Sequence, residues 1–174
     1  MRLVVDRVSS PHYGPIMSDE PRWLDDTEQR AWWALLEVGS GLFDLLTRDL
    51  KAIGGLTLDD YEVLHLLSNA EDRRLRIGDL STMMLASRTG LSQRIDRLTE
   101  RGWVVRLPCP EDRRVIWVVL TDEGYEFLVS VAPQHLEQVR RHVFDHLTRT
   151  DVEAIGRSLS KVAEHLHNLR TTGR

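Results

Sequence analysis

The stretch LASRTGLSQRIDRLTERGWVVRLPCPEDRRVIWVVLTDEG, residues Leu85–Gly124, decides the fold. Its first half predicts a helix that begins at the capping residue Ser87 and ends at Gly102. Apolar residues recur in this helix at spacings of four and three, which places Leu91, Ile95 and Leu98 on one buried side. The other side is polar, so the helix has one face for a core and one face for a partner.

Two β-strands are predicted after this helix, over 103–107 and 115–120, because both segments are rich in β-branched and aromatic residues. Pro108 and Pro110 bracket the loop between the strands and keep it out of the sheet. The tip of this loop carries two arginines. A helix that fits the major groove of DNA, beside an arginine-tipped hairpin that fits the minor groove, predicts a winged helix-turn-helix.

The polar face of the helix supplies candidate contacts to DNA, because arginine and glutamine have donor geometries that suit guanine and adenine. The helix residues that we predict to contact DNA are Ser87, Arg88, Thr89, Ser92, Gln93 and Arg97. For Arg97 and Arg101, the alternative is an ion pair on the helix surface with Asp96 or Glu100 and no role in DNA binding.

Arginines outside the helix extend this predicted surface. We expect one of the two loop arginines, Arg113 and Arg114, to enter the minor groove. The other would pair with Asp112 or Asp96 and hold the wing in place. The predicted clamps on the flanking DNA backbone are Arg73, Arg74 and Arg76.

Charge is distributed unevenly along the chain. The full sequence has a formal net charge of −4, which by itself argues against nucleic acid. Between Arg73 and Arg114, however, ten arginines against five acids give +5, which leaves −9 for the rest of the chain. Phosphate binding depends on local cation density, because each neutralised phosphate releases a counterion. The distribution favours a nucleic-acid partner, with a solvated charged face as the alternative.

Helices are predicted on both sides of the winged segment. Residues 1–21 are proline-rich and predict a flexible tail, whereas 24–53 predict a long helix that buries one wide apolar face. Thr57 begins the next helix with Asp60 in capping-box position. After Thr121, a helix is predicted that Pro133 kinks or splits.

The last predicted helix carries a narrow apolar seam, made of Val152, Ile155, Leu159, Val162, Leu166 and Leu169. Such spacing suits packing against another helix, and a small winged domain cannot bury all six residues. The seam therefore needs the first helix, a second subunit, or both. We predict a mainly α fold with a small β-hairpin wing. The winged helix-turn-helix domain would occupy 57–121, and the helical dimerisation region 22–56 and 122–172.

Three segments carry a family resemblance: Ser87–Arg106, the wing Pro110–Arg114, and the following Leu120–Gly124. With them the chain resembles the MarR family of transcriptional regulators over about residues 24–170. The wing followed by LTxEG is the specific part, since a helix-turn-helix alone is common to many families. The resemblance implies a homodimer that binds a pseudo-palindromic site on double-stranded DNA. It also implies repression that ends when a small aromatic or anionic ligand binds.

The single cysteine, Cys109, departs from the family pattern, in which Asp precedes the wing proline. Cys109 is either a small residue at a strand end or an oxidisable thiol whose pKa is lowered by neighbouring arginines. Oxidant-sensing members of the family carry their reactive cysteine near the start of the first helix, where this chain has none. Their mechanism is therefore not carried over.

Other side chains suggest a ligand pocket or a metal site. Helices that line the family's pocket carry Trp23, Trp32, Trp33 and His65, for which packing in the core is the alternative. His142 and His146 lie four residues apart, a spacing that can chelate zinc. No third ligand is identifiable and chance explains such a pair, so no metal and no cofactor are predicted.

Several classes of function are excluded by what the sequence lacks. It contains no HExxH, no GxSxG and no glycine-rich phosphate loop, so we predict no enzyme. No apolar run approaches membrane-spanning length or a secretory signal, which predicts a cytoplasmic protein without a membrane partner. The predicted function is a dimeric DNA-binding regulator, a repressor released by a ligand. The alternatives are a helical protein-interaction module with a degenerate winged helix, or a regulator that responds to redox or metal through Cys109 or His142 and His146.

Overall fold

The structure is a computed structural model that describes residues 21–84, 88–109, 112 and 114–172. The chain forms two compact units, residues 1–37 and 38–174, and each is described by itself. In the described part of the chain, no helix is long and apolar enough to cross a membrane.

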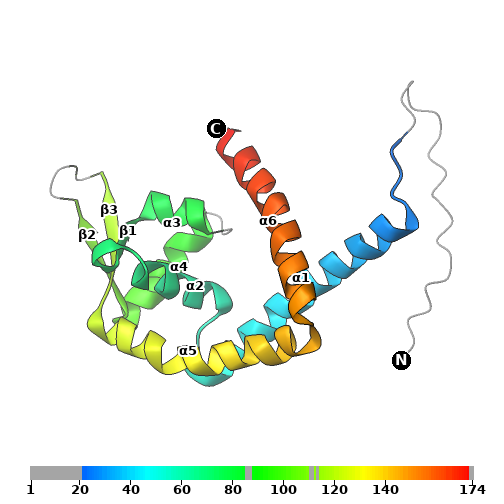
Figure 1. The fold of residues 1–174 in the computed structure, drawn as a ribbon. Helices are drawn as coiled ribbons and strands as arrows, with labels where there is room; N and C mark the ends of the chain where they lie inside the picture. Colours follow the sequence, from blue (N-terminus) through cyan, green and yellow to red (C-terminus); the bar gives the residue numbers. More distant parts are fainter. Residues whose placement is uncertain (1–20, 85–87, 110–111, 113, 173–174) are drawn as a thin grey trace. The chain divides into compact units, whose positions relative to one another are not determined.

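Helices dominate the fold, with one small sheet whose strand β1 precedes α3 and whose strands β2 and β3 lie between α4 and α5 in the chain (Figure 1). In chain order the elements are α1 (Asp26–Gly54), α2 (Leu58–Ser68), the 3-10 turn η1 (Glu71–Arg73), β1 (Arg74–Arg76), α3 (Ile77–Met83), α4 (Arg88–Glu100), β2 (Val104–Pro108), β3 (Ile116–Leu120), α5 (Asp122–His142), the 3-10 turn η2 (Phe144–His146) and α6 (Arg149–Thr172). The predicted fold class is confirmed.

The sheet is antiparallel, with strand order β1-β3-β2. The strands β2 and β3 form the predicted hairpin, and Val104 pairs with Leu120. The prediction that Pro108 lies outside the sheet is wrong, because Pro108 ends β2 opposite Ile116. A proline is tolerated there because β2 is an edge strand, where the missing N–H removes no ladder hydrogen bond.

The caps read from the sequence set the starts of three helices. At α2, Thr57 and Asp60 exchange hydrogen bonds in a capping box. At α5, the Gly124 N–H donates to the Thr121 hydroxyl at 3.0 Å. At α6, the Thr148 N–H donates to the Asp151 carboxylate at 2.9 Å. These caps satisfy N–H groups that have no partner within the helix.

One hydrophobic core joins the winged segment to the helices on either side. The buried side of α4 contributes Leu91, Ile95 and Leu98 to it, as predicted. Leu50 of α1 and Leu128 of α5 belong to the same core. The predicted boundaries between a DNA-binding domain and a dimerisation region stay a prediction.

The flanking helices differ from their predictions in two ways. First, α1 does not bury a wide face in the single chain, because only Leu46 and Leu50 of this helix are buried. Second, Pro133 does not split α5, which continues to His142. The proline forfeits one backbone hydrogen bond, and we attribute the continuity to packing of the neighbouring Val131 and His135, which are both buried.

Candidate nucleic-acid interface

Helix α4, which the sequence predicts to contact DNA and which is called the recognition helix below, presents a polar face opposite its buried side. Ser92 and Gln93 are exposed on this face. Arg88 and Thr89 form the first turn of α4, but their side chains, like the whole of Ser87, lie outside the described residues. The structure thus places two of the predicted contacts where a partner can reach them.

An arginine at the root of the wing braces the hairpin against α4. Arg106 of β2 donates to the Asp96 carboxylate, and its Nη2 donates to the Ser92 carbonyl oxygen at 3.1 Å. Of the two acids predicted as partners of a wing arginine, Asp96 is thus taken by Arg106, whereas Asp112 pairs with Arg114. This brace ties the wing strand to the face of α4 that carries Ser92. Sequence reasoning missed Arg106, which we count among the functional candidates.

At the wing tip, Arg114 extends into solvent, with 93% of its side chain exposed. The Arg114 side-chain Nε lies 3.3 Å from Asp112 Oδ1. The backbone N–H of Arg114 donates to the same oxygen at 3.0 Å. Arg113 lies outside the described residues. The role of these residues in DNA binding stays a prediction.

Arg94 and Arg97 of α4, and Arg101 directly after it, have partners in the segment around the start of α2. Arg94 is only 8% exposed and pairs with Asp59 and Asp60, which both belong to α2. Arg97 is half exposed and lies 3.1 Å from Asp60. Arg101 donates to the Gly55 carbonyl oxygen at 2.8 Å. The alternative reading, an ion pair of Arg97 and Arg101 with Asp96 or Glu100, is wrong in its partners, which are Asp60 for Arg97 and the Gly54 and Gly55 carbonyl oxygens for Arg101. The role of Arg97 in DNA binding stays a prediction.

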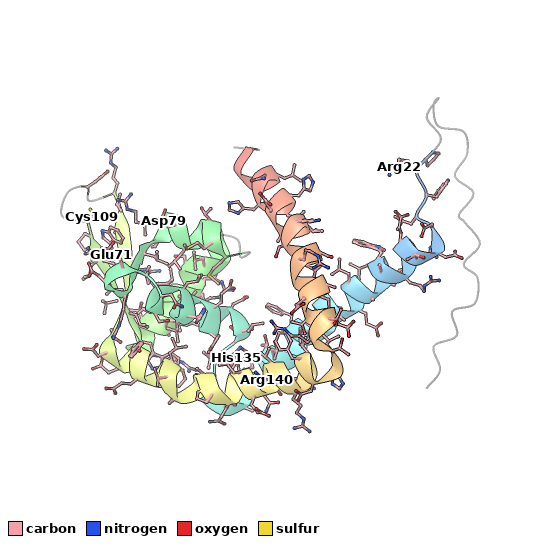
Figure 2. The ribbon with its side chains drawn as sticks, in the orientation of Figure 1. Arg22, Glu71, Asp79, Cys109, His135 and Arg140 are labelled. Carbon is pink, nitrogen blue, oxygen red and sulfur yellow. The ribbon has the colours of Figure 1, made fainter. Side chains whose placement is uncertain are left out.

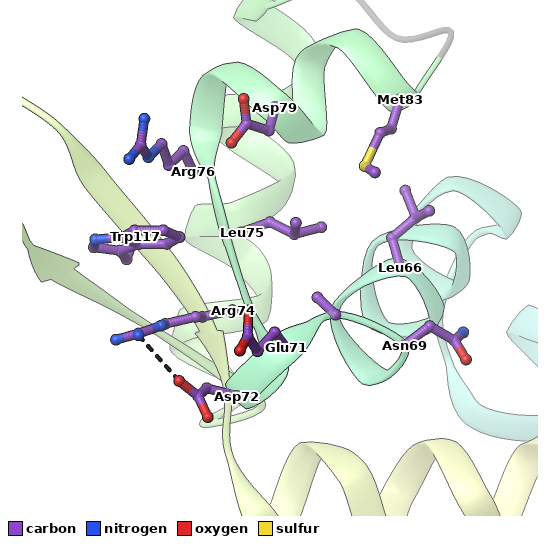
Figure 3. A pocket seen from close by; sticks show the side chains of 11 residues that line it. Leu66, Asn69, Glu71, Asp72, Arg74, Leu75, Arg76, Asp79, Met83 and Trp117 are labelled. Atoms are coloured by element: carbon purple, nitrogen blue, oxygen red, sulfur yellow. Dashed lines mark ion pairs between the residues drawn. The ribbon is translucent and has the colours of Figure 1, made fainter.

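The arginines of η1 and β1 contact both carboxylates and aromatic rings, and Figure 3 shows Arg74 and Arg76 beside Trp117. Arg73 pairs with Asp122 at 3.1 Å and Arg74 with Asp72 at 3.0 Å. The guanidinium carbons of Arg74 and Arg76 lie 5.0 and 5.2 Å from the centre of the Trp117 ring. Among the described residues, Arg76 forms no ion pair, so of the three predicted backbone clamps it has the most available charge.

A cavity of about 470 Å³ lies beside Trp117 (Figure 3). Leu66, Leu75 and Met83 form part of its apolar wall. None of the four predicted ligand-contacting residues lines this cavity. Trp23, Trp32 and Trp33 belong to the first compact unit and are exposed. His65 belongs to the second unit and is also exposed, so the predicted effector pocket stays a prediction.

Histidines gather where α2 packs on α5. The His135 ring is 4.3 Å from that of Tyr61, and Tyr61 stacks on His65 at 6.2 Å. His135 is 6% exposed and its Nδ1 has no hydrogen-bond partner within the described residues. In the sequence His135 stands seven residues before His142 on the same predicted helix, but nothing there predicts its burial against Tyr61.

The structure separates the two histidines that the sequence offers as a candidate zinc pair. His142 is the last residue of α5, and its Nε2 lies 2.9 Å from Asp49 Oδ2. His146 lies in η2, beyond a break in the helix at Val143. The two histidines therefore do not share one helix face. Within the described ranges, no cluster of three histidine, cysteine or acidic side chains is placed to hold a metal ion.

We expect acid to destabilise the protein through His135. Burial lowers the pKa of His135 below its ordinary value of 6.5, Asp49 opposes this, and His65 lowers the pKa further. As the pH falls below about 6.5, the unfolded chain binds more protons at this residue than the folded chain, so stability falls. Between pH 7.5 and 5.5, the free energy of unfolding measured by urea denaturation should fall less for His135→Phe than for the wild type. Equal decreases for the two proteins would contradict a role of His135 in acid sensitivity.

Cys109 is buried at the end of the hairpin strand, just before the wing loop (Figure 2). Its N–H donates to the Val115 carbonyl oxygen at 2.9 Å, which extends the pairing of the two strands by one residue. This placement fits a small residue at a strand end.

The fold and this surface define a winged helix-turn-helix protein. The family model described as MarR family matches residues 54–115. Sco3205 of Streptomyces coelicolor, a MarR family transcriptional regulator solved in complex with DNA, is 40% identical, with a TM-score of 0.81 over 86% of this chain and 93% of that chain. The chain belongs to the MarR family of transcriptional regulators.

Two further relatives agree with this assignment. The MarR family regulator AbsC, also of Streptomyces coelicolor, is 42% identical, with a TM-score of 0.79 over 85% of this chain and 99% of that chain. The transcriptional regulator PecS of Dickeya dadantii is 34% identical over 89 residues, which are 50% of this chain and 52% of that protein. The match with PecS thus spans about half the length of that regulator.

Proposed function

We propose that this protein is a homodimeric regulator that reads a pseudo-palindromic DNA site through α4 and the wing. The observation that carries the proposal is the Arg106 brace, which fixes the wing strand against the recognition helix beside exposed Ser92 and Gln93. A helix and a hairpin held in this way can enter neighbouring major and minor grooves together. The DNA complex of the relative Sco3205 supports the same use of this fold.

Repression and its release belong to the same proposal. A dimer that covers a promoter excludes polymerase, and a small aromatic or anionic ligand that favours another dimer geometry would release the DNA. Addition of simple aromatic carboxylates and phenols to the complex tests the release. The cytoplasmic location expected from the sequence stays a prediction.

The test begins with selection of genomic fragments on the immobilised full-length protein, followed by footprinting of the retained duplex. Retention of one or a few discrete sites at about 0.15 M salt supports the proposal, because non-specific binding weakens steeply with salt. If no fragment is retained better than random DNA, the protein-interaction module becomes the better description.

Loss of the exposed wing arginine should weaken this binding. We expect Arg114→Ala to lower affinity for the retained duplex about 10-fold, and to reduce the slope of log affinity against log salt by about one, because one phosphate contact is lost. Arg149→Ala is a matched control, since Arg149 is also exposed and paired with one carboxylate, that of Glu153 on α6. Fluorescence anisotropy across a salt series measures both. Equal affinities of the two variants would remove Arg114 from the interface.

A further inference from the structure

We infer that Asp60 is a positioning residue that holds the recognition helix at its reading angle, and so governs discrimination between operator and other DNA. The inference rests on the proposed DNA-binding function and deepens it. Asp60 is not on the predicted DNA face. It lies in the first turn of α2, three residues after the segment 55–57 that joins α1 to α2. The end of α1, this segment and the first turn of α2 are together called the junction.

Three arginines converge on this junction, two from α4 and one from the residue that follows it. Arg94 and Arg97 are three residues apart, so they lie on one side of the helix. Arg94 pairs with Asp59 and lies 3.7 Å from Asp60, and Arg97 lies 3.1 Å from Asp60. Arg101, directly after α4, donates to the carbonyl oxygens of Gly54 and Gly55 at the negative end of the α1 dipole. The junction therefore holds the C-terminal half of α4 and the residue after it.

The Asp60 carboxylate divides its two oxygens between two helices. Oδ2 accepts a hydrogen bond from the Thr57 N–H at 3.0 Å and so completes the cap of α2. Oδ1 accepts from Arg97 Nη2 of α4 at 3.1 Å. The residue is only 6% exposed, so the carboxylate has little freedom to leave this geometry. One fixed side chain thus links the start of α2 to the middle of α4.

The buried guanidinium of Arg94 points to orientation rather than stability. Its Nε and Nη1 have no hydrogen-bond partner within the described residues. A buried ion pair with unsatisfied donors is poor for stability, because desolvation offsets most of the attraction. An apolar residue at this position of α4 would fill the same buried space without unpaired donors. The ion pairs of Arg94 instead fix the orientation of α4 relative to α2.

Helix orientation affects operator and random DNA differently. Binding to random DNA depends on how many cations face phosphates, and it does not require groups on α4 to meet particular base edges. Reading bases requires donors and acceptors on α4, such as those of Ser92 and Gln93, to meet base edges within hydrogen-bonding distance. Loss of the Asp60 charge would also release Arg97, which adds one mobile cation near the interface. Operator affinity should fall while affinity for random DNA stays or rises.

The experiment compares Asp60→Asn, Asp60→Glu and Thr57→Ala in the full-length protein. The asparagine keeps the size and one acceptor but loses the charge, whereas glutamate keeps the charge at a position where it also completes a capping box. Thr57→Ala weakens the α2 cap and leaves the Asp60 carboxylate in place, which makes it the control for a loss of stability alone. Affinity is measured by anisotropy for the duplex recovered by genomic selection and for a random duplex.

We expect Asp60→Asn to lower the ratio of operator to random affinity at least about 10-fold and to steepen the salt slope on random DNA by about one. Asp60→Glu and Thr57→Ala should keep the ratio within about two-fold of the wild type. If Asp60→Asn lowers both affinities by one factor, or Thr57→Ala lowers the ratio as much, the inference is overturned.

A second variant keeps the test decisive if Asp60→Asn does not fold. Arg97→Gln removes the ion pair between Arg97 and Asp60 by changing the half-exposed partner instead of the buried one. We expect this variant to lower the ratio of operator to random affinity and to leave the salt slope on random DNA unchanged. A slope reduced by about one would instead make Arg97 a direct phosphate contact and overturn the inference. Failure of the wild type to retain any duplex overturns the proposed function, and this inference with it.

Discussion

Replacing Leu159 and Leu166 with glutamate is expected to convert a dimer into a monomer and to lower affinity for a two-half-site duplex at least about 100-fold. These leucines belong to the apolar seam of α6, whose members from Ile155 to Leu169 are 42–58% exposed in the single chain. A continuous apolar stripe of this length, with helical spacing of three and four, is typical of a helix that packs on another helix. Two buried carboxylates would have no partner there, so association would be lost.

DNA affinity should fall with the dimer because each protomer reads one half-site. In the dimer, the second recognition helix binds at an effective concentration set by the first, whereas a monomer gains no such advantage. Light scattering at micromolar concentration should give twice the 20.1 kDa chain mass for the wild type and the chain mass for the variant.

The matched control places the same charges on the outer side of α6. Ser160→Glu with His167→Glu has the same seven-residue spacing, and both positions are exposed. We expect this protein to remain a dimer and to bind the duplex as the wild type does. A monomeric wild type, or a dimeric Leu159→Glu, Leu166→Glu protein, would show that the seam is not the dimer interface.

Local signals predicted the winged segment well. The apolar spacing of Leu91, Ile95 and Leu98 fixed the buried side of α4, and β-branched residues marked both hairpin strands. The threonine caps at Thr57 and Thr121 placed two helix starts. Each of these features depends on residues within a few positions of one another, which is why sequence alone reveals them.

Ion-pair partners were not predictable in the same way. Arg94 and Asp59 are 35 residues apart, and Arg97 and Asp60 are 37 apart, so only the packing of α2 on α4 brings them together. Sequence reasoning offered Asp112 or Asp96 as the partner of a wing arginine. Arg114 pairs with Asp112, whereas Arg106 from the adjacent strand takes Asp96. A count of arginines therefore overstates the charge available to DNA.

The burial of α1 was overestimated for a different reason. An apolar face predicts that a helix is covered, but it does not say which surface covers it. In the single chain Trp32, Leu35 and Phe43 are exposed. The apolar seam of α6 is likewise exposed in the single chain. Both helices belong to the region that the sequence assigns to dimerisation. A second subunit that covers these faces accounts for both observations.

Gly124→Ala is expected to destabilise the protein by about 3 kcal/mol or more, the largest effect on stability that we predict. A Cβ atom at Gly124 would lie 2.1 Å from the Trp103 carbonyl oxygen and 2.9 Å from a Leu120 methyl group. That carbonyl oxygen accepts hydrogen bonds from the N–H of Thr121 at 3.0 Å and from its hydroxyl at 3.1 Å. The first turn of α5 would have to move away from β2 and break both.

Movement of α5 is opposed by aromatic packing as well. The rings of Trp103 and Phe127 stack with their centres 3.8 Å apart, so a shift that relieves the clash also separates them. Gly78→Ala is the control, because a Cβ at this α3 position meets nothing within 4 Å, and alanine should stabilise the helix by about 0.5–1 kcal/mol. Urea denaturation at one fixed protein concentration measures both, since the stability of a dimer depends on concentration. A Gly124→Ala protein within about 1 kcal/mol of the wild type would mean that the start of α5 can shift without losing its contacts to β2.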